Sequence, residues 1–176
     1  MDKILIVVDM QKDFVDGALG TPEAVAIVPA VVQKISQFSG KIYATLDTHP
    51  ENYMETSEGK KLPVPHCIKG TSGWELDKDV ASALAGRDHT IVEKPTFGSL
   101  QLPELIMSDI KGEPEAIELL GLCTDICVVS NALILKAAFP DAEISVDASL
   151  CAGVTPESHN AALEVMKMCQ INVVGR

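Results

Sequence analysis

The residues with the clearest chemical potential are two cysteines on one turn, in the stretch Gly121-Leu122-Cys123-Thr124-Asp125-Ile126-Cys127-Val128. The apolar run 116–120 before it predicts a buried strand, and the run 129–138 after it predicts a helix. At such a turn, helix N-terminal N–H groups and the helix dipole favour a thiolate or a developing oxyanion. The pattern therefore indicates a nucleophilic thiol, although Cys127 taken alone, in the first turn of an apolar helix, is more typical of a core residue than of a catalytic one.

A cysteine nucleophile needs a base and a group that holds its charge, and two other predicted strands end in such residues. Asp9 directly follows the apolar run 4–8, and Lys94 follows the run 89–93. Asp9 could serve as the base, while Lys94 could stabilise the thiolate and orient the carboxylate. Each residue alone fits a turn or a solvated surface position. Their joint placement at strand ends, where ligands bind in parallel sheets, favours a catalytic site.

A possible metal site follows another strand. Asp47 ends the run 42–46, His49 comes two residues later, and His66 lies in the same long loop. One carboxylate and two imidazoles suit Zn²⁺, Fe²⁺ or Mn²⁺, with positions left for water or substrate. His89 and His159 are interpreted as structural or exposed residues.

The remaining cysteines do not indicate disulfide chemistry. Five scattered cysteines form no disulfide framework, which favours a reducing cytoplasm. Cys67, Cys151 and Cys169 fit small apolar packing positions. Cys123 and Cys127 are separated by a Thr-Asp pair that is typical of a helix cap, so neither a disulfide nor a metal pair is expected there.

Strand-like and helix-like runs alternate along the chain. The predicted strands are 4–8, 42–46, 89–93, 116–120, 143–146 and 171–174, and the predicted helices are 22–38, 75–84, 102–110, 125–138 and 156–168. Pro29 should kink the first helix or mark its start, and Asp147 should follow the fifth strand. The pattern predicts an α/β fold, a three-layer α/β/α sandwich with a six-stranded parallel sheet, in a single domain spanning 1–176.

Composition excludes several classes of function. The net charge of −11 argues against binding to nucleic acid or to an anionic membrane, because both need a basic surface. The apolar runs are far shorter than the roughly 20 residues of a membrane span. The first residues run directly into a predicted strand and show no signal-peptide pattern. We therefore expect a cytoplasmic protein.

The same residues fall into five motifs in a fixed order. They are Asp9-Met10-Gln11-Lys12-Asp13-Phe14, Thr45-Leu46-Asp47-Thr48-His49-Pro50, Pro65-His66-Cys67-Ile68-Lys69-Gly70-Thr71, Lys94-Pro95-Thr96-Phe97 and the Gly121 to Val128 stretch. With these motifs the chain resembles the isochorismatase-like cysteine hydrolases, and within them the nicotinamidase/pyrazinamidase branch, over nearly its whole length.

The resemblance implies a catalytic triad of Asp9, Lys94 and Cys127. Cys127 would attack an amide carbonyl and release ammonia, and water activated by Asp9 would hydrolyse the resulting thioester. The backbone N–H groups of Cys123 and Cys127 would form the oxyanion hole. A cis peptide bond would join Leu122 to Cys123. The expected activity is that of a nicotinamidase, and homo-oligomers are common in the family.

The resemblance also assigns the metal ligands, which would be Asp47, His49 and His66. They would hold a divalent ion, with zinc expected first and iron or manganese as alternatives, and this ion would bind and orient the ring nitrogen of the substrate. The substrate pocket would include three further residues, Phe14, Phe97 and Leu122. The nicotinamidase branch commonly has a tryptophan shortly before the histidine-cysteine pair, whereas the segment 60–65 here contains no aromatic residue.

Other functions fit these residues less well. A related cysteine hydrolase that acts on another small carboxamide or ureido compound is the main alternative, because the aromatic residue is missing. Isochorismatase proper would have no use for the metal ligands. A phosphatase with Asp9 as nucleophile would need a second Asp two positions later, where this chain has Gln11. A scaffold that lost its activity is disfavoured by the intact triad.

Overall fold

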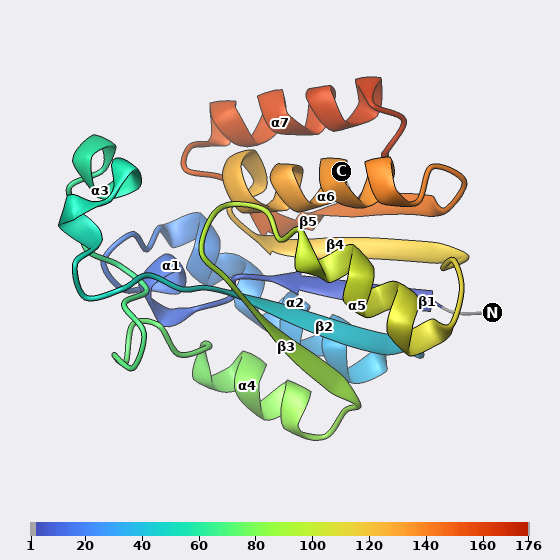
Figure 1. Cartoon of the computed structure of the whole chain (residues 1–176), viewed down its shortest axis with the longest axis horizontal. Coiled ribbons are helices and arrows are strands. Elements are labelled where there is room, and N and C mark those ends of the chain that lie inside the picture. Colours follow the sequence, from blue (N-terminus) through green and yellow to red (C-terminus); the bar gives the residue numbers. More distant parts are fainter. Residues whose placement is uncertain (1–2, 176) are drawn as a thin grey trace.

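The computed structural model describes residues 3–175, which form a central parallel sheet covered by helices on both faces (Figure 1). Its strands are β1 (Lys3–Val8), β2 (Lys41–Asp47), β3 (His89–Lys94), β4 (Ala116–Leu122), β5 (Glu143–Ala152) and β6 (Asn172–Val174). Their order is β3-β2-β1-β4-β5-β6, so the chain winds outward from β1 to both edges. The predicted α/β fold with six parallel strands is confirmed.

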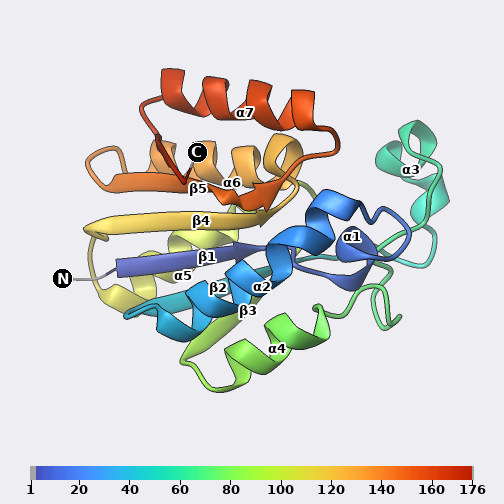
Figure 2. The same ribbon diagram turned by 180° about the vertical axis from the view of Figure 1, so that it is seen from behind.

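The helices form the two outer layers. Helices α2 (Pro22–Gln37) and α4 (Lys78–Ala85) pack together on one face, which Figure 2 shows in front, and α5 (Gln101–Ile110) and α6 (Val129–Ala138) cover the other. Helix α7 (Pro156–Met168) packs beside α6. No helix in the described part of the chain is long and apolar enough to cross a bilayer.

Local sequence explains most helix ends. Thr21 caps α2 by accepting a hydrogen bond from Ala24 N, and Pro22 occupies the first turn, where it costs no backbone bond. Pro29 neither starts nor divides this helix, which continues to Gln37. The start predicted for α4 at 75 was wrong: the helix begins at Lys78, because Asp77 caps its first turn.

The fifth strand differs most from its prediction. It continues to Ala152, so Asp147 lies inside β5 instead of following it. The register between β4 and β5 shifts between Leu119 and Gly121, and the pairing resumes at Cys151. The polar residues at 145, 147 and 149 interrupt the apolar pattern, so the sequence did not predict this continuation. Cys169 is exposed, which contradicts the packing role expected for it, whereas Cys67 and Cys151 are buried as expected.

Register brings the chemically active strand ends together. Val8 pairs with Gly121 across β1 and β4, and Asp47 pairs with Lys94 across β2 and β3. The connection from β2 to α4 is not wholly irregular, because it holds the short turns η1 (Tyr53–Glu55) and α3 (Ser57–Lys61). Two further short elements lie near the strand ends, α1 (Lys12–Val15) and the π-helix η2 (Thr124–Val128).

Candidate functional site

Three side chains from three different elements meet at the carboxyl edge of the sheet. Lys94 Nζ lies 2.6 Å from Asp9 Oδ2 and 3.4 Å from Cys127 Sγ. All three residues are almost completely buried. The sequence predicted each of them separately at a strand end, and the structure brings them into direct contact.

Asp9 is held in an unusual conformation by its neighbours. Its backbone has a φ of 45°, and Thr45 Oγ1 donates a 2.6 Å hydrogen bond to Asp9 Oδ1. The other carboxylate oxygen, Oδ2, faces the Lys94 ammonium, and no donor in the described part of the chain meets it at hydrogen-bonding angles. Asp9 therefore has one oxygen held by Thr45 and the other paired with the Lys94 ammonium. Thr45 was not singled out in the sequence.

The turn that carries Cys127 is wider than an α-helical turn. Both Ile126 N and Val128 N donate to Cys123 O, at 3.1 Å and 3.0 Å. The Leu122–Cys123 peptide bond is cis, as the resemblance implies. Gly121, with a φ of 118°, precedes it, and a Cβ there would lie 2.2 Å from Val8 O. Only glycine can place this turn so close to β1.

His89 and His159 lie outside the site. His159 Nδ1 lies 2.7 Å from Thr124 Oγ1, so α7 is joined to the start of the π-helix. His89 Nδ1 lies 3.0 Å from the Arg87 carbonyl oxygen, at the amino end of β3. His89 fits its structural interpretation, and His159 is half-buried and hydrogen-bonded.

Burial and the neighbouring charges together control the protonation of the three contacting groups. It raises the pKa of the Cys127 thiol well above its usual value, and the Asp9 carboxylate raises it further, while Lys94 opposes both. Burial also raises the pKa of Asp9, against the effect of the Lys94 ammonium. Burial alone would lower the pKa of Lys94, but the nearby Asp9 charge outweighs it and the pKa is raised. The raised pKa favours a neutral thiol for Cys127 beside a charged lysine, in contrast to the thiolate that helix-dipole reasoning favours.

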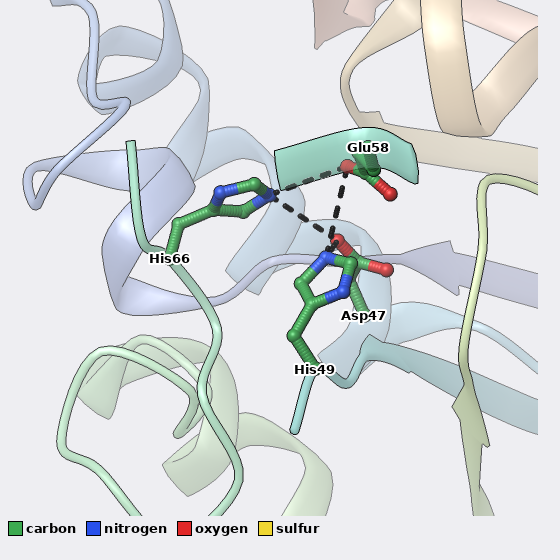
Figure 3. Close-up of side chains that lie close together, drawn as sticks. All are labelled: Asp47, His49, Glu58 and His66. Atoms are coloured by element: carbon green, nitrogen blue, oxygen red, sulfur yellow. Dashed lines mark hydrogen bonds and ion pairs between the residues drawn. The ribbon is translucent and has the colours of Figure 1, made fainter. Parts of the chain in front are cut away.

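A second cluster lies beside the first. The structure brings the three predicted metal ligands together and adds Glu58, so that one ligand atom from each of the four residues lies within 4.8 Å of the others (Figure 3). Asp47 Oδ2 is 3.0 Å from His49 Nε2 and 3.7 Å from His66 Nε2. Glu58 Oε1 is 3.7 Å from both Nε2 atoms. Sequence reasoning missed Glu58, because a lone glutamate in a polar loop carries no motif.

The donor set fits a divalent metal ion. Two imidazoles and two carboxylates are common zinc ligands. The 2.8 Å contact of His66 Nδ1 with the Val64 carbonyl oxygen requires a proton on Nδ1, so in the neutral imidazole the lone pair of Nε2 faces the cluster. Burial and Asp47 both raise the pKa of Glu58, and a cation between the two carboxylates would relieve this repulsion.

Packing and backbone bonds support this cluster from outside. The Tyr53 ring is edge-on to His49 at 4.8 Å and to His66 at 5.1 Å between ring centroids. Gln11, also missed in the sequence, accepts from Asp47 N at 2.7 Å and donates to Asp47 O at 2.8 Å. Asp47 links the two clusters, because its Oδ1 lies 3.4 Å from Lys94 Nζ.

A cavity of about 580 Å³ opens over both clusters. Cys123 and Cys127 line it, and so do Asp47, Glu58 and His66. The three predicted pocket residues all line it: Phe14, Phe97 and Leu122. Its size lies within the range of small-molecule sites.

Comparisons with known proteins match this geometry. The model of the isochorismatase domain family matches residues 3–175. The crystal structure of nicotinamidase/pyrazinamidase PncA from Bacillus subtilis superposes with a TM-score of 0.85 at 26% identity, covering 99% of this chain and 100% of that one. Pyrazinamidase of Pyrococcus horikoshii in complex with zinc gives a TM-score of 0.80 at 28% identity, with full coverage of both chains. Nicotinamidase/pyrazinamidase of Mycobacterium tuberculosis is 26% identical over 185 residues, covering 98% of each chain.

Proposed function

The chain belongs to the isochorismatase family, and we propose that it is a cysteine-dependent amidohydrolase that converts nicotinamide and water to nicotinate and ammonia. The observation that carries this proposal is the buried contact of Lys94 with both Asp9 and Cys127, where Cys127 lines a cavity that is also lined by three of the four residues that could hold a metal ion. The names of the similar proteins support the choice of substrate.

In the first half of the reaction, the Cys127 thiol passes its proton to Oδ2 of Asp9, the oxygen paired with Lys94, as the sulfur attacks the amide carbon. The S–C bond forms, and the carbonyl π electrons move to oxygen. The backbone N–H groups of Cys123 and Cys127 stabilise this oxyanion. Asp9 then gives the proton to the amide nitrogen, and ammonia leaves as the thioester forms.

In the second half, Asp9 takes a proton from water, and the hydroxyl oxygen attacks the thioester carbon. Collapse of the oxyanion breaks the C–S bond, and the proton on Asp9 returns to Cys127 sulfur. Lys94 remains charged throughout, because Asp9 and Asp47 surround it. Its ammonium stabilises each form of the site that carries negative charge on sulfur or on Asp9.

The residues that would hold a divalent metal ion, zinc first, are Asp47, His49, Glu58 and His66. When bound, the ion supplies a Lewis-acid site for the ring nitrogen of the substrate. Phe14, Phe97 and Leu122 provide apolar contacts for the ring. A homo-oligomer and a cytoplasmic location stay predictions of the sequence.

An ammonia-release assay over a panel of small amides, with and without chelator, tests this function. We expect release from nicotinamide and pyrazinamide, loss of release after chelation, and recovery on addition of zinc. If the metal-loaded protein leaves nicotinamide and its analogues untouched, the substrate assignment is wrong.

A second substrate class has one observation in its favour. Leu62, an aliphatic residue, lines the cavity from the segment 60–65, in which the nicotinamidase branch commonly has a tryptophan. An aliphatic wall gives no ring stacking, which suits a non-aromatic carboxamide or ureido compound. Faster ammonia release from such compounds than from nicotinamide would favour this alternative.

A further inference from the structure

Asn131 lies in α6, four residues after Cys127, and its side chain is fully buried. Both ends of its amide group are used. Nδ2 donates to Cys127 O at 2.8 Å and to Phe97 O at 3.2 Å, and Oδ1 accepts from Ser99 N at 2.9 Å. Asparagine is a poor residue for a helix interior. Its position in the core is therefore explained by these three bonds and not by the helix.

The bond to Cys127 reaches the backbone of the residue that carries the nucleophile. Cys127 lies in the π-helix η2, whose wide turn joins Val128 N to Cys123 O. The Asn131 side chain fixes the carbonyl group of Cys127 and with it the direction of its Cα–Cβ bond. That direction sets the 3.4 Å contact between Cys127 Sγ and Lys94 Nζ.

The bonds to Phe97 and Ser99 act on the loop between β3 and α5. Thr96 and Phe97 of this loop line the cavity, and the Thr96 carbonyl accepts a 3.1 Å hydrogen bond from Lys94 Nζ. The loop also packs tightly on α6, because a Cβ at Gly98 would lie 2.5 Å from the Ile134 side chain. One side chain thus joins the cavity wall to the nucleophile.

We propose that Asn131 is a positioning residue with two separable contacts: a nucleophile contact through Cys127 O, and a wall contact through Phe97 O and Ser99 N. The nucleophile contact sets the rate of the chemical step, and the wall contact sets the affinity for substrate. This inference rests on the proposed function, because it takes Cys127 as the nucleophile.

Two substitutions separate the contacts. In Asn131→Ser, the hydroxyl can donate to the carbonyl four residues earlier and keeps the nucleophile contact, but it does not reach the loop. In Asn131→Asp, the carboxylate still accepts from Ser99 N and keeps that part of the wall contact, but the donor bonds to Cys127 O and to Phe97 O are lost. We expect Asn131→Ser to raise KM about 3–10-fold with kcat nearly unchanged, and Asn131→Asp to lower kcat about 10–100-fold with a smaller change in KM.

Asn160 gives a matched control. It lies in α7, is exposed, and donates through Nδ2 to the carbonyl of Pro156, four residues earlier, at 2.8 Å. Asn160→Ser and Asn160→Asp should keep wild-type kcat and KM. Thermal unfolding of all four variants establishes which of them are folded at the assay temperature.

The inference is overturned if folded Asn131→Ser and Asn131→Asp have the same kcat and KM as each other or as wild type. If the wild type releases no ammonia from any amide, the proposed function has failed, and the nucleophile contact is tested by iodoacetamide labelling of Cys127. Asn131→Asp should then be labelled at least about 3-fold more slowly than Asn131→Ser, since a misplaced thiol loses the Lys94 contact. Asn131→Ala loses both contacts and introduces no charge, so labelling of Cys127 should be slower than in Asn131→Ser in this variant as well. Equal labelling of Asn131→Ser, Asn131→Asp and Asn131→Ala would overturn it.

Discussion

The two halves of the site are built in different ways. Asp9 and Lys94 stand at or beside the ends of strands, and Cys127 follows a strand by a short turn, so a rigid sheet fixes all three. In the metal-binding cluster only Asp47 belongs to a strand. His49, Glu58 and His66 come from the connection that follows β2. The comparison teaches that the contacts of the proposed catalytic residues depend on the fold as a whole, whereas the candidate metal site depends on how the connection between β2 and α4 is held in place.

Loss of Lys94 should have the largest effect, because it lies between two buried carboxylates. Lys94→Met removes the partner of Asp9 and Asp47, and we expect a loss of about 3–5 kcal/mol in the free energy of unfolding. Activity should fall by at least about 1,000-fold, as when a member of a catalytic triad is removed. Urea unfolding and ammonia release measure the two effects.

Lys69→Met is the matched control for that loss. Lys69 pairs with Glu93 at 2.6 Å on the surface, and its removal should cost at most about 1 kcal/mol. Equal destabilisation by the two substitutions would show that the buried contacts of Lys94 are no stronger than a surface pair.

The reactivity of Cys127 should depend steeply on pH. Burial raises the pKa of its thiol, so the thiolate fraction increases about tenfold per pH unit from pH 7 to pH 9. Iodoacetamide labelling of the Cys127 peptide should rise in parallel, and the exposed Cys169 provides a reference within the same protein. A labelling rate that is already at its plateau at pH 7 would mean that the resting form is a thiolate.

Glu58→Gln tests whether Glu58 belongs to the candidate metal site. The amide keeps the shape of the side chain but removes a negative charge from the cluster, and we expect zinc affinity to fall by at least about 10-fold. Glu55→Gln is the control, because Glu55 lies in the same connection and accepts from Asn52 on the surface. Zinc titration against a competing chelator reports on both variants, and equal affinities would remove Glu58 from the set of ligands.

Cys123→Ala should have the smallest effect. Burial raises the pKa of the Cys123 thiol to about 12, so this side chain is neutral, and the proposed mechanism uses only its backbone N–H. We expect kcat within about 3-fold of wild type, since the cavity loses one small group. A loss as large as that of Cys127→Ala would contradict this division between the two cysteines.

The sequence predicted the sheet and the residues at its ends because strand ends in a parallel sheet share one edge. Asp9, Lys94 and Cys127 could be found in this way without knowledge of their distances. The length of β5 could not be found, because its polar residues interrupt the apolar pattern.

Residues that act through tertiary contacts were also missed. Glu58 reaches the cluster from a connection held by tertiary contacts, among them the bond that the Tyr53 hydroxyl donates to the Leu62 carbonyl oxygen. Gln11 and Asn131 act through bonds to backbone atoms that are distant in sequence. No local pattern records such bonds, so they become visible only in the folded chain.

The central claim is that amide hydrolysis passes through a thioester on Cys127. Acid quenching of the metal-loaded enzyme during turnover of nicotinamide, followed by intact-mass measurement and peptide mapping, tests it directly. We predict a transient increase in mass equal to one acyl group, located on the peptide that contains Cys127 and absent from Cys127→Ala. Continued ammonia release by Cys127→Ala, or an acyl group located on Cys123, would contradict the claim.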